Sequence, residues 1–225
     1  MPALILVAAS GLAREVIVST RSTGTHVVVG FLDDDPALRG TIISGVPVLG
    51  PIADAVRYPG AQFVLCAGKG SVRERIALQL EDLGVHDSSY ATVIDPTAVV
   101  PPGSAVGEGS ILLAHVVLTA DVRVGRHVVA MPHVTLTHDD VLADFATLAA
   151  GVSLGGGVRI GRGAYLGMNA SVRERCTIGA GTTVGMGAAV VHNVPDGETW
   201  VGVPARSLER HEEIDVANLE VGRMV

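Results

Sequence analysis

From residue 94 to residue 190, an aliphatic side chain stands at every sixth position of the chain. Ala130 is the smallest member of this series, and no insertion breaks its register. A fixed short period of this kind indicates a solenoid built from stacked repeats. The series consists of Ile94, Val100, Val106, Leu112, Leu118, Val124, Ala130, Leu136, Leu142, Leu148, Leu154, Ile160, Leu166, Val172, Ile178, Val184 and Val190.

A second position, two residues before each aliphatic one, is mostly small or β-branched, as at Ala98, Val116, Val134 and Ala170. Because side chains alternate along a strand, both positions point inward. Glycine or alanine follows the aliphatic residue at intervals of 18 residues, at Gly107, Gly125, Ala143, Gly161 and Gly179. We therefore predict a parallel β-helix with three hexapeptides per coil. The glycines are expected at one corner, where a tight bend favours a residue without a side chain.

Residues 1–90 show a different pattern, in which short apolar runs alternate with helical stretches. This alternation predicts a small α/β domain with a parallel sheet, with strands at 4–9, 27–32 and 63–67 and helices at 13–22 and 72–83. Ser71 followed by Glu74 has the spacing of a capping box and is expected to start the second helix. We divide the chain into an α/β domain at 1–90, a β-helix domain at 91–206 and a tail at 207–225. The tail is expected to form a short amphipathic helix over the open end of the coil.

Two loops of the α/β domain are candidates for ligand binding. Ser10 and Gly11 lie where the first strand runs into a helix, a geometry that presents backbone N–H groups to a phosphate. Gly68 and Lys69 follow a later strand and can close over the same ligand. With a single glycine in the first turn, an ordinary strand-to-helix connection explains it as well as a phosphate site does.

An acidic segment follows the strand at 27–32. Asp33, Asp34 and Asp35 lie at the carboxyl end of that strand, which is where open α/β sheets bind ligands. Their carboxylates can accept hydrogen bonds from a ribose or a base. A solvated turn closed by Pro36 is an equally good interpretation of the segment.

Composition narrows the classes of function. The formal net charge is −7, without the basic stripe that binding to a nucleic-acid backbone requires. The two cysteines, Cys66 and Cys176, lie in apolar runs, which indicates buried free thiols in a reducing compartment. No apolar run reaches the roughly 18 residues of a membrane span, and the first residues lack the basic segment of a signal peptide. We expect a soluble cytoplasmic protein without a nucleic-acid or membrane partner.

Several motifs carry a family resemblance that covers nearly the whole chain. In the front domain they are Ala9-Ser10-Gly11, Gly30-Phe31-Leu32-Asp33-Asp34-Asp35 and Gly68-Lys69-Gly70. In the repeat region they are Thr137-His138-Asp139, Leu154-Gly155-Gly156 and Gly202-Val203-Pro204-Ala205-Arg206. With these motifs the chain resembles the NeuD-like family of sialic acid O-acetyltransferases and bacterial nucleotide 4-amino-sugar N-acetyltransferases. Many acyltransferases share the hexapeptide run, whereas the front domain with its acidic segment narrows the choice.

The resemblance implies a Rossmann-like domain followed by a left-handed β-helix, assembled as a homotrimer. It also implies acetyl-CoA as co-substrate, bound along the β-helix between subunits, and a nucleotide-linked amino-sugar as acceptor, with no metal. A UDP- or dTDP-linked 4-amino-sugar is favoured. The residues implied at the nucleotide-sugar are Ser10, Gly11, Asp33, Asp34, Asp35, Gly68 and Lys69. Those implied at the acetyl-CoA are Gly156, Thr147, Gly202, Pro204 and Arg206. The mean hydropathy of +0.45 agrees with a trimer, because a narrow β-helix alone cannot hide so much apolar surface.

His138 is the candidate general base. Attack on a thioester needs an unprotonated amine or an activated hydroxyl, and histidine is the usual side chain for taking up that proton. The position of the family's catalytic histidine falls on His138, and Asp139 beside it can hold the imidazole tautomer, as the aspartate of a catalytic triad does. The resemblance places the backbone N–H of Gly156 at the oxyanion that forms during transfer.

Five positions depart from the family pattern. Leu12 replaces a histidine in the first turn, and Met131 replaces an asparagine near the acceptor. Thr147 and Ala150 stand where a histidine and a proline commonly flank the acetyl group. Asp140 replaces a cysteine at an inward position, where a charge is costly unless it is hydrogen-bonded or protonated. These changes affect the expected substrate more than the expected reaction.

Two other classes of function remain open. His115 and His133 are 18 residues apart and thus stacked at one corner, and with His138 they resemble the zinc ligands of γ-class carbonic anhydrases. The front domain has no role in such a hydratase, and Asp139 is better explained by acyl transfer. The altered pocket positions are also compatible with a non-catalytic nucleotide-binding protein.

Overall fold

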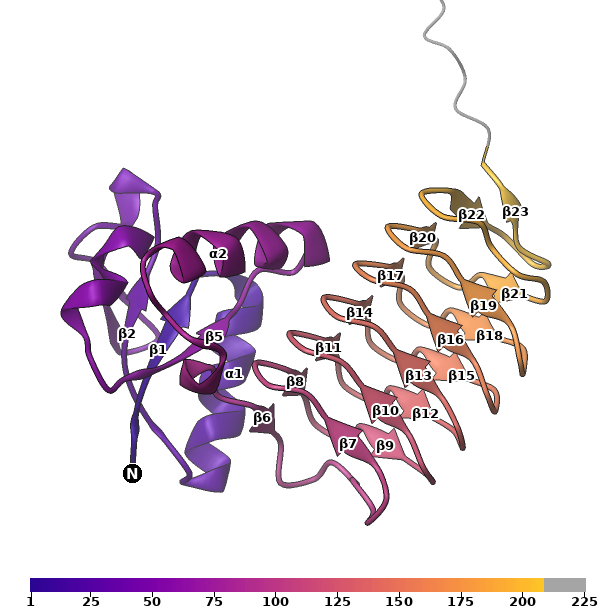
Figure 1. Ribbon diagram of the computed structural model, residues 1–225, viewed down its shortest axis with the longest axis horizontal. Helices are drawn as coiled ribbons and strands as arrows, with labels where there is room; N and C mark the ends of the chain where they lie inside the picture. Colours follow the sequence, from indigo (N-terminus) through magenta and orange to yellow (C-terminus); the bar gives the residue numbers. More distant parts are fainter. Residues whose placement is uncertain (209–225) are drawn as a thin grey trace, which may run out of the picture.

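The computed structural model describes residues 1–208 and shows two parts in contact (Figure 1). An α/β domain lies against the first coils of a long stack of very short strands, and the later coils extend away from it (Figure 1). The helix expected in the tail falls mainly at residues 209–225, which lie outside the described residues. The fold class predicted from the sequence is confirmed.

The sheet of the α/β domain has the order β3-β4-β2-β1-β5. Its strands are β1 (Ala3–Val7), β2 (Val27–Leu32), β3 (Ile42–Ile43), β4 (Val46–Gly50) and β5 (Gln62–Leu65). The run β4-β2-β1-β5 is parallel, as predicted, but β3 pairs antiparallel with β4. The sequence analysis missed this edge hairpin, in which Ser44 and Gly45 form the turn with positive φ angles of 52° and 79°.

Alternate residues of β1 face two different cores. Leu4 and Leu6 pack against helix α1 (Gly11–Thr23), and Ile5 and Val7 pack against helix α2 (Gly70–Asp82) and the short helix η2 (Ile52–Arg57). The shorter 3-10 helices are η1 (Pro36–Leu38) and η3 (Asp87–Ser89). The core on the α1 side also contains Ile111 and Val129 from the β-helix. One apolar cluster therefore joins the two parts of the molecule.

The predicted capping box at Ser71 and Glu74 is wrong. Helix α2 begins at Gly70, its N-cap is Lys69, and no side chain caps it. The Glu74 carboxylate instead accepts hydrogen bonds from Arg162 of the β-helix, at 2.9 Å from Nε and 2.8 Å from Nη2. The charge-assisted hydrogen bonds with Arg162 are stronger than a capping bond to a backbone N–H, so the Glu74 carboxylate does not cap the helix.

The sixfold series sets the geometry of the β-helix. Each aliphatic position from Val106 to Val190 is the second residue of a two-residue strand, and strands 18 residues apart pair in parallel, as in Val129 with Thr147. Three hexapeptides per coil are thus confirmed. The strands are β6 (Val93–Ile94), β7 (Ala105–Val106), β8 (Ile111–Leu112), β9 (Val117–Leu118), β10 (Arg123–Val124), β11 (Val129–Ala130), β12 (Thr135–Leu136), β13 (Val141–Leu142), β14 (Thr147–Leu148), β15 (Ser153–Leu154), β16 (Arg159–Ile160), β17 (Tyr165–Leu166), β18 (Ser171–Val172), β19 (Thr177–Ile178), β20 (Thr183–Val184), β21 (Ala189–Val190), β22 (Thr199–Val201) and β23 (Arg206–Ser207).

The coil has three faces. The first, which we call the domain-side face, runs β6-β8-β11-β14-β17-β20-β22, and its first strands pack against the α/β domain. The second contains β9, β12, β15, β18 and β21, and the third contains β7, β10, β13, β16 and β19. We call the corner between the second and third faces the far corner, because it is opposite the domain-side face. Thr137–Asp140, which links β12 to β13, is one turn of the far corner.

The reason for the 18-residue glycine series differs from the expected one. Gly125 and Gly161 do not have positive φ; the left-handed residues lie two positions further on, at His127 (52°) and Gly163 (65°). A Cβ atom on Gly125 would lie 2.8 Å from the backbone N of Asp144, and one on Gly161 would lie 2.5 Å from that of Ala180. These glycines are required because successive coils approach closely there, and not because the chain bends.

Two expectations from the composition can be compared with the structure. Cys66 and Cys176 are both free and buried, as predicted. Burial raises the pKa of the Cys66 thiol, which therefore stays protonated inside the sheet. Within residues 1–208, no helix combines the length and apolarity needed to cross a membrane.

Asp140 provides a test of the buried coil. Its side chain is fully buried, and its two oxygens accept hydrogen bonds from the backbone N–H groups of Thr137 and Val158, both at 2.8 Å. Burial, opposed by these two bonds, raises the pKa of the carboxyl from 3.8 to about 6. The folded chain therefore holds this proton to a higher pH than the unfolded chain does, and the wild type loses stability as the pH rises from about 4 to about 6.

Asp140→Asn does not titrate and escapes this loss. Relative to wild type, its free energy of unfolding is expected to rise by roughly 3 kcal/mol between about pH 4 and pH 7. Urea unfolding of both proteins at several pH values measures the difference. A difference that stays constant with pH would contradict the buried, proton-binding state of Asp140.

Candidate active site

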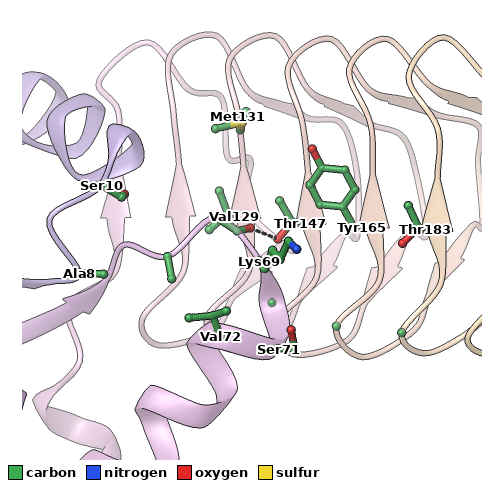
Figure 2. Close-up of a pocket in the computed structure, with 15 residues that line it drawn as sticks. Ala8, Ser10, Lys69, Ser71, Val72, Val129, Met131, Thr147, Tyr165 and Thr183 are labelled. Atoms are coloured by element: carbon green, nitrogen blue, oxygen red, sulfur yellow. Dashed lines mark hydrogen bonds between the residues drawn. The ribbon is translucent and has the colours of Figure 1, made fainter. Parts of the chain in front are cut away.

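A pocket of about 900 Å³ lies between the α/β domain and the domain-side face (Figure 2). One wall consists of outward-pointing residues at 18-residue intervals on paired strands, namely Val129, Thr147, Tyr165 and Thr183. Figure 2 shows these side chains on successive strands, with Lys69 beside Thr147. The other wall consists of the loops after β1 and β5, with Ala8, Ser10, Ala67, Gly68, Lys69, Gly70, Ser71 and Val72. Lys69 is the charged residue among those that line the pocket.

The N-terminus of α2 opens onto this pocket and rests on the β-helix. Gly70 and Ser71, its first two residues, line the cavity. A Cβ atom on Gly70 would lie 2.1 Å from the carbonyl oxygen of Phe145 and 3.2 Å from the Cα atom of Gly163. Only glycine allows the helix to begin this close to the coil. Within residues 1–208, the backbone N–H groups of Gly70 and Ser71 donate to no backbone acceptor.

Arg73 lies one turn into α2 and is fully buried. Its Nε donates to the carbonyl of His127 at 2.9 Å. Its Nη1 donates to the carbonyls of Ala67 and Gly68 at 2.8 and 3.0 Å. Its Nη2 donates to the carbonyls of Phe145 and Ala146 and to Thr147 Oγ1, at 2.9, 3.0 and 2.9 Å. One planar group thus connects the loop after β5 with two coils of the β-helix.

None of the six hydrogen-bond acceptors of Arg73 is a carboxylate, so none of them balances its positive charge. Burial lowers the pKa of its guanidinium to about 10, so the group stays protonated at neutral pH. The sequence analysis missed this residue. The signal was present, because Arg73, Ile76 and Leu80 have the spacing of one helix face and all three are buried.

Ser10 is held by structural hydrogen bonds at the edge of the pocket. Its Oγ caps α1 by accepting from the N–H of Ala13 at 3.3 Å, and it donates to the carbonyl of Cys66. Gly11, the first residue of α1, is exposed but is not part of the pocket wall. Of the residues implied at the nucleotide-sugar, the structure brings Ser10, Gly68 and Lys69 together around the cavity.

The acidic segment is occupied by backbone hydrogen bonds. Asp33 Oδ2 accepts from the N–H of Ala9 at 2.7 Å and so joins the end of β2 to the first turn. Asp34 accepts from the N–H of Ile52 at 2.8 Å, and Asp35 caps η1. None of the three carboxylates lines the pocket.

His138, Asp139 and Gly156 meet at the far corner. Nδ1 of His138 lies 2.8 Å from Oδ2 of Asp139, and both side chains are about two-thirds exposed. Gly156 lies one coil further on, and a Cβ atom there would be 2.3 Å from Nε2 of His138. The histidine ring therefore lies over a backbone that only glycine leaves open. Within residues 1–208, the N–H of Gly156 donates to no acceptor.

The proposed base and the pocket are on opposite sides of the coil. The pocket is on the domain-side face, and neither His138, Asp139 nor Gly156 lines it. His138 and Thr147 differ by nine residues, which is half of an 18-residue coil, so a single chain does not bring the two together.

The remaining residues implied at the acetyl-CoA lie elsewhere. Gly202 and Pro204 belong to the turn after β22, and Arg206 begins β23, all at the last coil. This turn is tied to β21 by hydrogen bonds from the Ala189 N–H to the Gly202 carbonyl, at 3.0 Å, and from the Ala205 N–H to the Ala189 carbonyl, at 2.8 Å. Thr147, by contrast, lies in the pocket wall, where its hydroxyl donates to the Gly68 carbonyl at 3.1 Å.

The other departures from the family pattern can now be placed. Leu12 is a buried core residue of α1 itself, and Met131 lines the pocket while packing against the same core. Ala150 lies half-buried at a corner of the coil. Of these three departures, only Met131 changes the pocket wall, where it places an apolar side chain.

The three histidines considered as metal ligands do not meet within one chain. His115 and His133 stack with ring centroids 5.0 Å apart and an interplanar angle of 23°. His138 lies at the next corner, beyond β12. No group of three potential ligands from His, Cys, Asp and Glu gathers anywhere in residues 1–208.

Two family models match the sequence. Residues 3–80 match the PglD N-terminal domain, and residues 157–192 match the bacterial transferase hexapeptide repeat. No entry among the curated proteins matches the chain.

Solved structures match over nearly the whole chain. The acetyltransferase domain of PglB from Neisseria gonorrhoeae, in complex with acetyl coenzyme A, is 30% identical, with 92% of this chain and 98% of that chain covered and a TM-score of 0.84. PerB from Caulobacter crescentus, in complex with CoA and GDP-perosamine, is 31% identical, with 93% and 98% covered and a TM-score of 0.83. WeeI from Acinetobacter baumannii is 31% identical, with 92% and 100% covered and a TM-score of 0.83.

The fold and these matches define a hexapeptide-repeat acyltransferase that uses acetyl-CoA. More narrowly, the chain belongs to the NeuD-like family of nucleotide-sugar acetyltransferases, which includes PglB, PerB and WeeI. The resemblance inferred from the sequence motifs is thus confirmed.

Gly70 offers a direct test of the contact between α2 and the coil. Gly70→Ala places a methyl group against the Phe145 carbonyl and is expected to lower the free energy of unfolding by about 1–3 kcal/mol. Gly68→Ala is the matched control, because a Cβ atom there meets nothing within 4 Å. Equal stability of the two variants in chemical denaturation would show that α2 does not rest on the coil in this way.

Proposed function

We propose that the protein transfers the acetyl group of acetyl-CoA to a nucleotide-linked amino-sugar held in the pocket. The observation that carries this proposal is the pocket itself, in which one lysine and the N-terminus of α2 face a row of outward side chains on the β-helix. Its volume of about 900 Å³ is in the range of cavities that hold ligands of this size. The relative PerB binds CoA and GDP-perosamine, which supports a nucleotide-sugar as acceptor.

The diphosphate of the acceptor has a natural place at the start of α2. The helix presents unpaired backbone N–H groups and the positive end of its dipole to the pocket, and both favour an anion. Lys69, the N-cap residue, adds a full positive charge at the same point. The sugar then extends along the row formed by Val129, Thr147 and Tyr165.

His138 acts as general base in a direct transfer. With Nδ1–H donated to Asp139, Nε2 is the nitrogen that accepts the proton of the attacking amine as its bond to the thioester carbon forms. The N–H of Gly156, beside Nε2, stabilises the tetrahedral oxyanion. When the C–S bond breaks, the imidazolium returns the proton to the thiolate, and CoA leaves as a thiol.

The acceptor site is completed by a second copy of the chain in a homotrimer. Because pocket and base lie on opposite sides of one coil, the far corner of one copy must approach the pocket of the next. Exposed apolar side chains on the later coils support an assembly, since Met168, Met186 and Val203 are 49%, 74% and 76% exposed. In a closed ring of three copies with head-to-tail contacts, each pocket receives the far corner of one neighbour.

His138→Ala tests the base. Loss of a general base is expected to lower kcat about 10²- to 10⁴-fold, with little change in KM for either substrate. Thiol release from acetyl-CoA with a panel of UDP-, dTDP- and GDP-linked 4-amino-sugars measures this, with a chelator present throughout. His192→Ala is the control, because His192 occupies the equivalent corner position three coils further on. Unchanged kcat in His138→Ala would remove this residue from the reaction.

Complementation tests the shared site. Lys69→Ala and His138→Ala are each expected to be nearly inactive. If each site draws on two neighbouring copies, a trimer containing both chains regains about one site in three. Co-expression with two different affinity tags yields these mixed oligomers, and light scattering gives the number of copies. Mixed oligomers without recovered activity, or an active monomer, would refute the shared site.

A further inference from the structure

The loop between β5 and α2 forms an exposed part of the pocket wall. Gly68 and Lys69 are both exposed, although they lie between the buried residues Ala67 and Gly70. The carbonyl of Gly68 accepts hydrogen bonds from Arg73 Nη1 and from Thr147 Oγ1. A single glycine carbonyl thus connects the exposed loop to the helix behind it and to the β-helix in front of it.

We propose that Arg73 is the positioning residue of the acceptor pocket, fixing Lys69 and the N-terminus of α2 relative to Thr147 and so setting affinity for the nucleotide part of the acceptor. This inference rests on the proposed function. Arg73 does not line the pocket itself, but three of its hydrogen-bond partners, Ala67, Gly68 and Thr147, do.

The geometry requires arginine and not merely a positive charge. The guanidinium is a rigid plane with five N–H donors, and here Nη1 serves the loop while Nη2 and Nε serve two coils. Lysine has a compact head with three donors and cannot serve acceptors on three sides at these distances. A change in the loop position therefore follows from Arg73→Lys even though the charge is retained.

The charge also acts on the ligand. All six acceptors of Arg73 are neutral, so the buried cation has no counter-charge among its hydrogen-bond partners. Three of these acceptors, on Ala67, Gly68 and Thr147, belong to residues that line the cavity. An anionic ligand in the pocket supplies the missing counter-charge, which favours a diphosphate over a neutral ligand.

The test compares Arg73→Lys and Arg73→Met in the full-length protein, with Arg75→Met as matched control. Arg75 lies on the same helix but is exposed. We expect KM for the nucleotide-sugar, and the calorimetric dissociation constant of the corresponding nucleotide diphosphate alone, to rise about tenfold or more in both variants. KM for acetyl-CoA is expected to stay within about twofold, and hydrogen exchange is expected to accelerate in peptides covering 66–72 but not in those covering 152–190.

Thr147→Val provides a second route if Arg73→Met fails to fold. It removes one of the two hydrogen bonds to the Gly68 carbonyl, and its effect on nucleotide affinity should be smaller, in the same direction, and non-additive with Arg73→Lys.

Equal changes in both KM values, or unchanged nucleotide affinity despite faster exchange in the loop, would overturn the positioning role. Failure of the proposed function is a separate result, in which the wild type itself neither binds UDP, dTDP or GDP nor transfers acetyl to their amino-sugars.

Discussion

The hydrogen bonds of one buried guanidinium determine how the two parts of this molecule meet. Arg73 donates hydrogen bonds to carbonyls of the loop after β5 and of two successive coils of the β-helix. These bonds fix the orientation of the α/β domain on the domain-side face. Burying a charge in this way is stable only when its donors are satisfied, and here five of the six acceptors are backbone carbonyls and the sixth is the Thr147 hydroxyl. The pocket, the exposed Lys69 and the start of α2 are consequences of that orientation.

The regular coil supplies the other half of the site. Pairing at 18-residue intervals places Val129, Thr147, Tyr165 and Thr183 in one row, which forms one wall of the pocket. The same repetition places Gly156 one coil after His138, where the absence of a side chain makes room for the imidazole. A rigid scaffold of this kind holds catalytic groups without help from long loops.

Much of this arrangement could be predicted from the sequence, for physical reasons that differ between the parts. The sixfold series predicted the coil because every short strand needs an inward aliphatic residue. The 18-residue period also places His138 and Thr147 half a coil apart, because their numbers differ by nine. The β3-β4 hairpin was missed because β3 has only two residues and Pro47 interrupts the apolar run of β4. Arg73 was missed because an arginine in an amphipathic helix is ordinarily exposed, and the capping box failed because Glu74 has a stronger partner in Arg162. The contact between copies could only be inferred, since periodicity describes one chain.

We propose that a nucleotide-linked amino-sugar accepts the acetyl group directly from acetyl-CoA. The most direct measurement is mass spectrometry of the purified protein and of the sugar after incubation with acetyl-CoA and each nucleotide-linked 4-amino-sugar in turn. We expect that one sugar gains a single acetyl group, that free CoA appears in equal amount, and that the protein itself never carries the acetyl group. An acetylated protein as intermediate, or release of CoA that does not depend on any sugar, would contradict it.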